Sequence, residues 1–293
     1  MDVAILGCGY LGIELGRQLQ SLGCRVIGVR RSESGCARLR DAGFDAVRAD
    51  VTEGSSLEAV PDVDWLVYAA SAGRGDEGRA REVYVEGLRT SIETFGDRRD
   101  PPDRLVYTSS TGVYEGRGGR WVDETTTLTP ETDRGRILAE AERVAIDRAR
   151  TVGVDGTVAR LAGIYGPNRY RLPAYLEGPV EPGVRNLVHR TDAAAAIGYL
   201  LSHDRARGEV VLVVDDEPVD RWLFADWLAE RCGEPYPPKR SVDGLVSERD
   251  EGQEHLPDAK RCSNDRLRGL GFSFRYPTFR SGYRPAIERY RGN

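Results

Sequence analysis

The stretch "AILGCGYLG", residues 4–12, decides the expected fold of this chain. Its three glycines, Gly7, Gly9 and Gly12, stand between an apolar run and a segment with the spacing of an amphipathic helix. In a strand–turn–helix unit the first glycine allows a tight turn, the second lets the backbone approach a pyrophosphate, and the third lets helix and strand pack closely. Because a helix N-terminus also offers unpaired N–H groups to phosphates, the stretch predicts a dinucleotide site that includes Tyr10 and Leu11. The alternative is a strand–helix turn that binds no ligand.

The end of the second expected strand indicates which dinucleotide would bind. The run "RVIGV" leads into Arg30, Arg31 and Ser32, and the first carboxylate to follow is that of Glu33. An acidic residue at this place binds the ribose 2′-hydroxyl of NAD, whereas an arginine accommodates the 2′-phosphate of NADP. The sequence therefore favours NADP over NAD. The alternative is that these are solvated surface arginines in an arginine-rich chain.

The rest of the chain alternates short apolar runs with helical patterns, which is typical of a doubly wound parallel sheet in an α/β fold. We expect a dinucleotide-binding domain over residues 1–160 and a smaller substrate lobe over 161–293, with 191–215 returning to the first domain. In the first domain the expected strands are 2–7, 24–29, 44–49, 63–70, 104–110 and 154–160, and the expected helices are 10–22, 79–96 and one that begins near Thr129, its N-cap, with Pro130 at its first position. In the later part we expect a helix after Thr191, a strand over 210–215 and a helix over 220–232.

Composition argues against several other classes of protein. The 293 residues carry a net charge of -5, which disfavours a nucleic-acid partner. Five cysteines without a CxxC pair and three scattered histidines disfavour a disulfide scaffold or a metal site. We expect neither a membrane span nor a signal peptide, because no apolar run approaches membrane-spanning length and the N-terminus lacks a basic segment followed by a long apolar run. We expect a cytoplasmic monomer or homodimer with an unknown small-molecule substrate and without a membrane partner.

Several motifs give the chain a specific resemblance. After the third strand comes Asp50-Val51, and the fourth strand runs into "YAASA", residues 68–72. Later come "YTSSTGVYE" (107–115), "RLAGIYGPNR" (160–169) and "NLVHRTDAAAAI" (186–197). Together these resemble the extended short-chain dehydrogenases/reductases, also called NAD-dependent epimerases/dehydratases, over nearly the whole length.

The resemblance implies roles for individual residues. Asp50 and Val51 would contact the adenine, and the segment with Ala69, Ala70 and Ser71 would cross the nicotinamide ribose. Ser109 would lie at the cofactor, and Ser110 would bond the reacting oxygen of the substrate. Residues expected to border the substrate are Tyr114, Tyr165, Arg169 and His189. For each of these four, packing or surface exposure is the competing interpretation.

The chain departs from that family in its expected catalytic helix. The family carries Tyr-x-x-x-Lys there, but "LTPETDRGRILAEAERVA" (128–145) aligns Asp133 with the tyrosine and Ile137 with the lysine. Four residues before Lys239 and Lys260, the two lysines of the chain, stand Pro235 and Leu256. The sequence therefore resembles atypical members that lack the dyad.

Asp133 is the candidate to replace the missing acid. Desolvation beside Ile137 would raise its pKa and make it a proton donor; the alternative is a solvated carboxylate or one paired with Arg134 or Arg136. The expected function is NADP-dependent oxidoreductase or epimerase-like chemistry on a small polar or sugar-derived substrate. The competing function is a non-catalytic NADP-binding sensor or scaffold.

Overall fold

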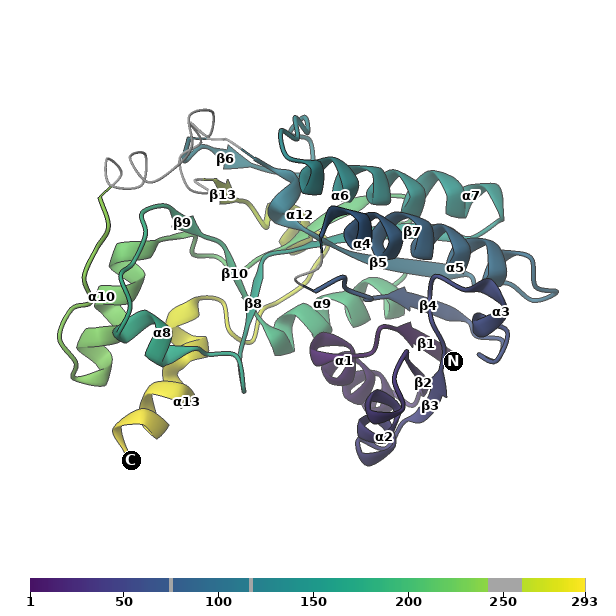
Figure 1. The fold of residues 1–293 in the computed structure, drawn as a ribbon, viewed down its shortest axis with the longest axis horizontal. Helices are drawn as coiled ribbons and strands as arrows, with labels where there is room; N and C mark the ends of the chain where they lie inside the picture. The colour runs from purple at the N-terminus through teal and green to yellow at the C-terminus, as the bar shows by residue number, and fades with distance from the viewer. Residues whose placement is uncertain (74–75, 116–117, 242–259, 293) are drawn as a thin grey trace. The chain divides into compact units, whose positions relative to one another are not determined.

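The computed structural model describes residues 1–73, 76–115, 118–241 and 260–292. These form two compact units, and the chain passes from one unit to the other several times (Figure 1). Unit 1 comprises Met1–Val113, Leu128–Leu161 and Ala193–Val211. Unit 2 comprises Tyr114–Thr127, Ala162–Asp192 and the described residues from 212 onward. The described residues of 114–127 thus belong to unit 2, whereas the sequence alone places all of residues 1–160 in one domain.

Unit 1 is built on the seven-stranded sheet of the described chain, and the expected doubly wound α/β fold is confirmed. Neighbouring strands run parallel, with Val3 opposite Val26 and Ile5 opposite Val67. The residues of the first strand from Val3 to Leu6 are fully buried, as expected for strands covered on both faces. In spatial order the strands are β11 (Val210–Val213), β7 (Asp155–Leu161), β5 (Arg104–Ser110), β4 (Trp65–Tyr68), β1 (Asp2–Leu6), β2 (Arg25–Arg30) and β3 (Asp45–Arg48).

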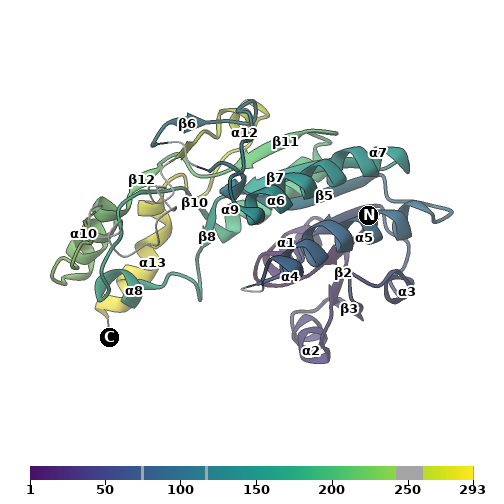
Figure 2. The ribbon, with the colours of Figure 1, turned by 45° about the horizontal axis from the view of Figure 1, so that its top comes forward.

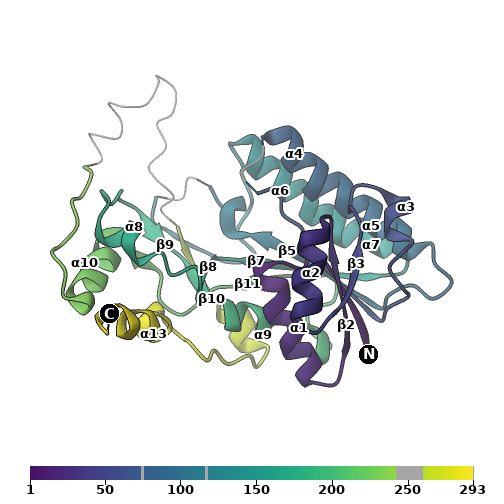
Figure 3. The ribbon, with the colours of Figure 1, turned by 60° about the horizontal axis from the view of Figure 1, so that its bottom comes forward.

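Helices cover both faces of this sheet. On one face lie two long helices, each made of three consecutive segments, which Figure 2 shows side by side. Figure 3 shows the helices of the other face. The first face carries α4 (Glu77–Arg81), η1 (Glu82–Glu86) and α5 (Gly87–Gly96) as one continuous helix, and α6 (Asp133–Arg143), η3 (Val144–Arg148) and α7 (Ala149–Thr151) as another. The second face carries α1 (Tyr10–Ser21), α2 (Glu33–Asp41) and α9 (Arg190–Ser202), while α3 (Gly54–Leu57) and η2 (Thr111–Val113) are single turns in connections.

A buried arginine at the start of β5 bonds to β7 and to the loop after α9. Arg104 begins β5 and is fully buried. Its guanidinium donates to the carbonyl oxygen of Arg205 at 2.8 Å and to Thr157 Oγ1 at 3.1 Å, and it pairs with Asp204. These partners offset part of the cost of burying the cation, while Arg104 Nε has no hydrogen-bond partner among the described residues.

The start of α6 corrects the sequence-based expectation. Thr129 was expected to cap this helix, but the helix begins at Asp133, and the N–H of Gly135 donates to Thr132 Oγ at 3.0 Å. Both threonines have the right chemistry for a cap. Thr132 is followed directly by an acidic residue in the first turn, which the positive end of the helix dipole favours.

Unit 2 combines short strand pairs with helices. Parallel pairs join β8 (Gly163–Tyr165) to β10 (Leu187–His189) and β6 (Trp121–Val122) to β13 (Arg261–Cys262), and an antiparallel pair joins β9 (Val184–Arg185) to β12 (Val219–Asp220). Its helices are α8 (Leu172–Leu176), α10 (Arg221–Cys232), α12 (Asp265–Gly269) and α13 (Phe279–Arg291). The helix expected over 220–232 is therefore present, whereas the tail folds into α13, which the sequence reading did not anticipate.

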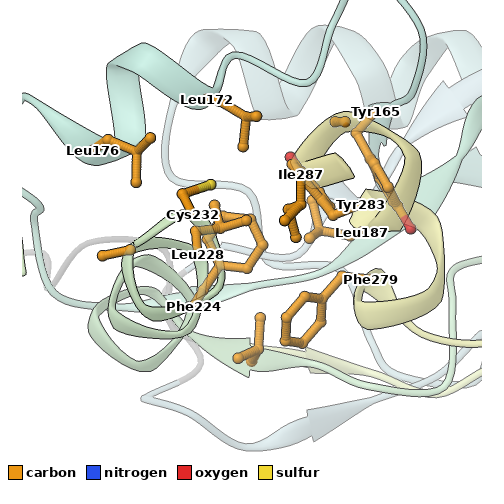
Figure 4. Close-up of a cluster of buried hydrophobic side chains, with 13 residues drawn as sticks. Tyr165, Leu172, Leu176, Leu187, Phe224, Leu228, Cys232, Phe279, Tyr283 and Ile287 are labelled. Atoms are coloured by element: carbon orange, nitrogen blue, oxygen red, sulfur yellow. The ribbon is translucent and has the colours of Figure 1, made fainter. Parts of the chain in front are cut away.

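The core of unit 2 is aromatic (Figure 4). Phe224 of α10 is fully buried, and its ring centroid lies 5.1 Å from that of Phe279 and 5.3 Å from that of Tyr283. Tyr165 stacks on Tyr283 with their ring centroids 4.8 Å apart, and Gly282 leaves room for it, because a methyl group there would come within 2.0 Å of Tyr165 Oη.

Among the helices described, none combines the length and apolar character needed to cross a bilayer.

Candidate active site

The glycine turn after β1 needs its first glycine for backbone reasons. Gly7 has φ of 75°, and a methyl group there would come within 2.3 Å of the Cα atom of Ala70. The N–H groups of Gly7 and Cys8 both donate to the carbonyl oxygen of Val29 at 3.1 Å. The turn is therefore held against β2 and the end of β4, with the N-terminus of α1 directly behind it.

Arg30 lies over this turn. A methyl group on Gly9 would come within 2.9 Å of Arg30 Nη1, and one on Gly35 within 2.9 Å of Arg30 Nε. The guanidinium thus occupies the space between the glycine turn and the start of α2, where the N–H of Gly35 donates to Ser32 Oγ at 3.1 Å. The glycines leave their backbone N–H groups open beside the Arg30 guanidinium, and this combination suits the binding of a phosphate group.

The charged residues next to Arg30 in the sequence pair with other side chains. Glu33, the first carboxylate after β2, pairs with Arg40 at 2.8 Å. Arg31 is exposed, and its Nη1 lies 3.8 Å from a carboxylate oxygen of Asp50. Burial raises the pKa of the Cys8 thiol to about 12, although the charge of Arg30 opposes this shift. Cys8 is therefore a neutral packing residue in this turn.

The other expected cofactor residues of unit 1 lie at the same edge of the sheet, at the carboxyl ends of the strands. Asp50 follows β3, and its Oδ1 accepts from the N–H and the hydroxyl of Thr52 at 3.1 and 2.9 Å. Val51 is buried, and the N–H of Ala69 donates to the Leu6 carbonyl at 2.8 Å. This edge is where open α/β sheets bind ligands.

The two serines at the end of β5 have different surroundings. The Ser109 hydroxyl donates to Glu142 Oε1 at 2.6 Å, and Glu142 forms a buried pair with Arg160 at 2.6 Å. Ser109 is thus engaged in the core. Ser110 is partly exposed and accepts from the N–H of Gly112 at 3.1 Å, which is the local capping role foreseen as its alternative.

Asp133 does not have the surroundings of a proton donor. Its side chain is 54% exposed, and Arg136 Nε donates to it at 3.1 Å. This hydrogen bond and the charge of Arg136 lower the pKa of Asp133. The first turn of α6 points this carboxylate to solvent, so the arginine-paired alternative describes it rather than the desolvated acid.

A different row of α6 faces β5. Glu142 bonds Ser109, and four residues earlier Leu138 lies near the strand end, where a methyl group on Gly112 would be 3.7 Å from Leu138 Cδ1 and 3.3 Å from Ser110 Oγ. Another four residues earlier stands Arg134. Positions four apart share a helix face, so Leu138 and Glu142 lie on the face that meets β5, and Arg134 stands one turn before Leu138.

The four expected substrate residues lie in unit 2. Tyr114 is fully buried, and its hydroxyl donates to the Asp123 carbonyl at 2.6 Å. Tyr165 belongs to the aromatic core. The buried His189 accepts from the Thr191 N–H at 3.2 Å and lies 4.0 Å from the Tyr276 ring, whereas Arg169 is exposed. Packing describes the two tyrosines, and Tyr165 meets His189 edge to face, with their ring centroids 5.3 Å apart.

The arrangement of unit 1 has a clear counterpart among known proteins. Residues 3–213 match the model of the NAD dependent epimerase/dehydratase family. The chain belongs to this family. Protein YeeZ of Escherichia coli is 32% identical over 286 residues, which cover 94% of this chain and 96% of YeeZ.

Solved structures agree with this family membership. A functionally unknown conserved protein from Silicibacter pomeroyi superposes with a TM-score of 0.78 at 29% identity, covering 98% of each chain. The dTDP-glucose 4,6-dehydratase of Bacillus anthracis, in complex with NAD, superposes with a TM-score of 0.80 over 100% of this chain and 97% of its own. At 21% identity that second likeness concerns the fold.

In this member of the epimerase/dehydratase family the structure adds a residue that sequence reasoning missed. Tyr84, in η1, accepts from Arg134 Nη2 at 3.4 Å, and its hydroxyl lies 3.4 Å from Ser71 Oγ. These three residues come from distant segments with no recognisable spacing, so the sequence held no signal for their contact.

Within the described ranges, no group of three or more His, Cys, Asp or Glu side chains is placed to hold a metal ion.

Proposed function

We propose that this chain is an NADP-dependent oxidoreductase, or an epimerase-like enzyme using the same hydride chemistry, on a small polar or sugar-derived substrate. The observation that carries the cofactor preference is the position of Arg30 between Gly9 and the start of α2. A guanidinium there can donate hydrogen bonds to a ribose 2′-phosphate. Glu33, the carboxylate that could instead bind the ribose 2′-hydroxyl of NAD, is paired with Arg40. Family membership and the NAD complex of the Bacillus anthracis relative support the use of a nicotinamide cofactor.

The residues of unit 1 would divide the work in a simple way. The glycine turn and the N-terminus of α1 would hold the pyrophosphate, Arg30 and Arg31 the 2′-phosphate, and Asp50 with Val51 the adenine. The bound cofactor would supply the hydride. The protein then has to orient the substrate oxygen, for which Ser110 is the candidate, and to exchange one proton with it.

The first experiment compares NADPH with NADH by nucleotide fluorescence. We expect NADPH to bind more tightly, and Arg30→Asp to weaken NADPH binding by about 1.5–3 kcal/mol, the range for hydrogen bonds to charged groups. Arg38→Asp makes the same charge change on an exposed position of α2 and should leave the affinity unchanged. Equal affinities for the two nucleotides, or equal effects of the two variants, would contradict the NADP assignment.

The competing proposal is a non-catalytic NADP-binding sensor or scaffold. It is favoured by the missing Tyr-x-x-x-Lys pair and by the paired, exposed state of Asp133. A panel of aldehydes, ketones and nucleotide sugars separates the two proposals. Tight NADPH binding without turnover across the panel would favour the sensor.

A further inference from the structure

We propose that Tyr84 is the residue that exchanges a proton with the substrate oxygen, and that Arg134 is the cation that positions and activates it. This inference rests on the proposed oxidoreductase function and names the group that replaces the missing pair. A phenol is a poor acid–base group at neutral pH unless a cation adjoins it. The structure places a guanidinium beside a phenol at the same edge of the sheet as the glycine turn.

Tyr84 is held rigidly in place. It is 8% exposed and sits in the middle of η1, a π-helical turn of the kind that often occurs at functional sites. The buried Tyr68 hydroxyl of β4 donates to the carbonyl oxygen of Val83 and anchors this turn to the sheet. Gly87 permits the contact, because a methyl group there would come within 2.8 Å of Tyr68 Oη.

Arg134 reaches Tyr84 from the first turn of α6. Its Nη2 donates to Tyr84 Oη at 3.4 Å, and its Cζ lies 5.8 Å from the centre of the Tyr84 ring. The distance is long for a hydrogen bond, as is common for catalytic contacts in the absence of ligand. Because Thr132 caps this helix, the Arg134 backbone is fixed next to a satisfied helix end.

Ser71 completes the group on the cofactor side. Its hydroxyl lies 3.4 Å from Tyr84 Oη and also accepts from the Gly73 N–H at 3.2 Å. Ser71 is exposed and follows Ala69 and Ala70, which pack against the glycine turn. Tyr84 therefore faces an exposed hydroxyl on one side and a guanidinium on the other, which gives its proton a route to solvent.

The proposed step balances. In reduction, a bound nicotinamide would supply the hydride to the substrate carbonyl carbon, and Tyr84 would give its hydroxyl proton to the carbonyl oxygen. One C–H bond and one O–H bond would form in the product, while the C–H bond of the reduced nicotinamide, the O–H bond of Tyr84 and the π bond of the carbonyl would break. The negative charge on Tyr84 Oη is compensated by Arg134, and water returns the proton through Ser71. Oxidation runs the same step in reverse.

The first test measures the reactivity of Tyr84 without turnover. An aryl sulfonyl fluoride labels nucleophilic phenols, and peptide mass spectrometry compares Tyr84 with the other tyrosines of the chain. We expect Arg134→Met to slow labelling of Tyr84 about tenfold, because it removes the guanidinium that donates to the reacting phenolic oxygen, and Arg134→Lys to restore most of the rate. Arg136→Met, which removes an arginine paired with Asp133 on the same helix, should leave the rate unchanged. NADPH should protect Tyr84.

The second test is kinetic. Tyr84→Phe should lower kcat by about a hundredfold or more while the NADPH Kd and the circular-dichroism spectrum stay unchanged. Turnover within about threefold of wild type in that variant, or Tyr84 labelling that Arg134→Met does not slow, would overturn the assignment. Failure of the wild type to bind NADPH would instead overturn the proposed function, and the labelling ratio would still decide whether Arg134 activates Tyr84.

Discussion

Among single residues, Asp215 is a buried carboxylate with one unpaired oxygen in the described chain. It follows β11 in unit 2 and is 1% exposed. Its Oδ1 accepts from the Glu217 N–H at 3.2 Å, while Oδ2 has no hydrogen-bond partner in the part of the chain that the structure describes. Burial raises the pKa of Asp215 well above its ordinary value. The folded protein therefore keeps a proton that the unfolded chain releases.

The sign of the resulting pH dependence follows from this difference. Above about pH 4, where an aspartate ionises in the unfolded chain, the folded state binds more protons, so the free energy of unfolding falls as the pH rises. Asp215→Asn removes this contribution. In urea denaturation from pH 4 to pH 8, we expect the variant to gain stability relative to wild type as the pH rises, by about 1.4 kcal/mol for each unit of the pKa shift.

The neighbouring Asp216 is the matched control. It accepts from Arg268 Nε at 2.8 Å and from Asn264 Nδ2 at 2.7 Å. Asp216→Asn should therefore lose about 0.2–1 kcal/mol at neutral pH, as expected for a partly exposed ion pair. Parallel pH profiles for Asp215→Asn and wild type would show that Asp215 is ionised in the folded protein.

At the scale of elements, the cap of α6 gives a direct comparison between two threonines. Thr132→Ala should lower the free energy of unfolding by about 1 kcal/mol, the usual loss for a threonine N-cap. Thr129→Ala should change it by less than about 0.5 kcal/mol, because Thr129 lies outside the helix. Urea denaturation measures both. A larger loss for Thr129→Ala would mean that the helix begins where the sequence alone suggested.

The sequence predicted most elements of unit 1 because their signals are local. Apolar runs such as "DVAILG" and "RLVYTSS" became buried parallel strands within one or two residues of the expected ends. The start of α6 was missed because two threonines compete for one cap. The site around Tyr84 was missed because it depends on a π-helical turn and on Tyr68 and Arg134, which are far apart in the chain. The short strands of unit 2 have two or three residues each and carry no periodicity to recognise.

For the molecule as a whole, the expected nucleotide residues all fall in unit 1. We therefore expect saturating NADPH to slow amide hydrogen exchange mainly at residues 7–12, 30–35 and 69–73. At a hundred times the Kd the ligand adds about 2.7 kcal/mol of stability. Peptides from α10 and α13, which contain none of these residues, should exchange as before. Protection confined to unit 2 would contradict the placement of the nucleotide.

The exchange of chain between the two units has a consequence for biosynthesis. A nascent chain that has emerged only as far as Val113 carries β5 as the free edge of an unfinished sheet, since its partner β7 has yet to be made. An unpaired edge of this kind invites pairing with other chains. Arg104 on that edge needs Asp204 and the carbonyl of Arg205, about a hundred residues further on. At roughly 5–20 residues per second, the ribosome leaves that cation without its partners for several seconds, and for that interval the β5 edge stays open to pairing with other chains.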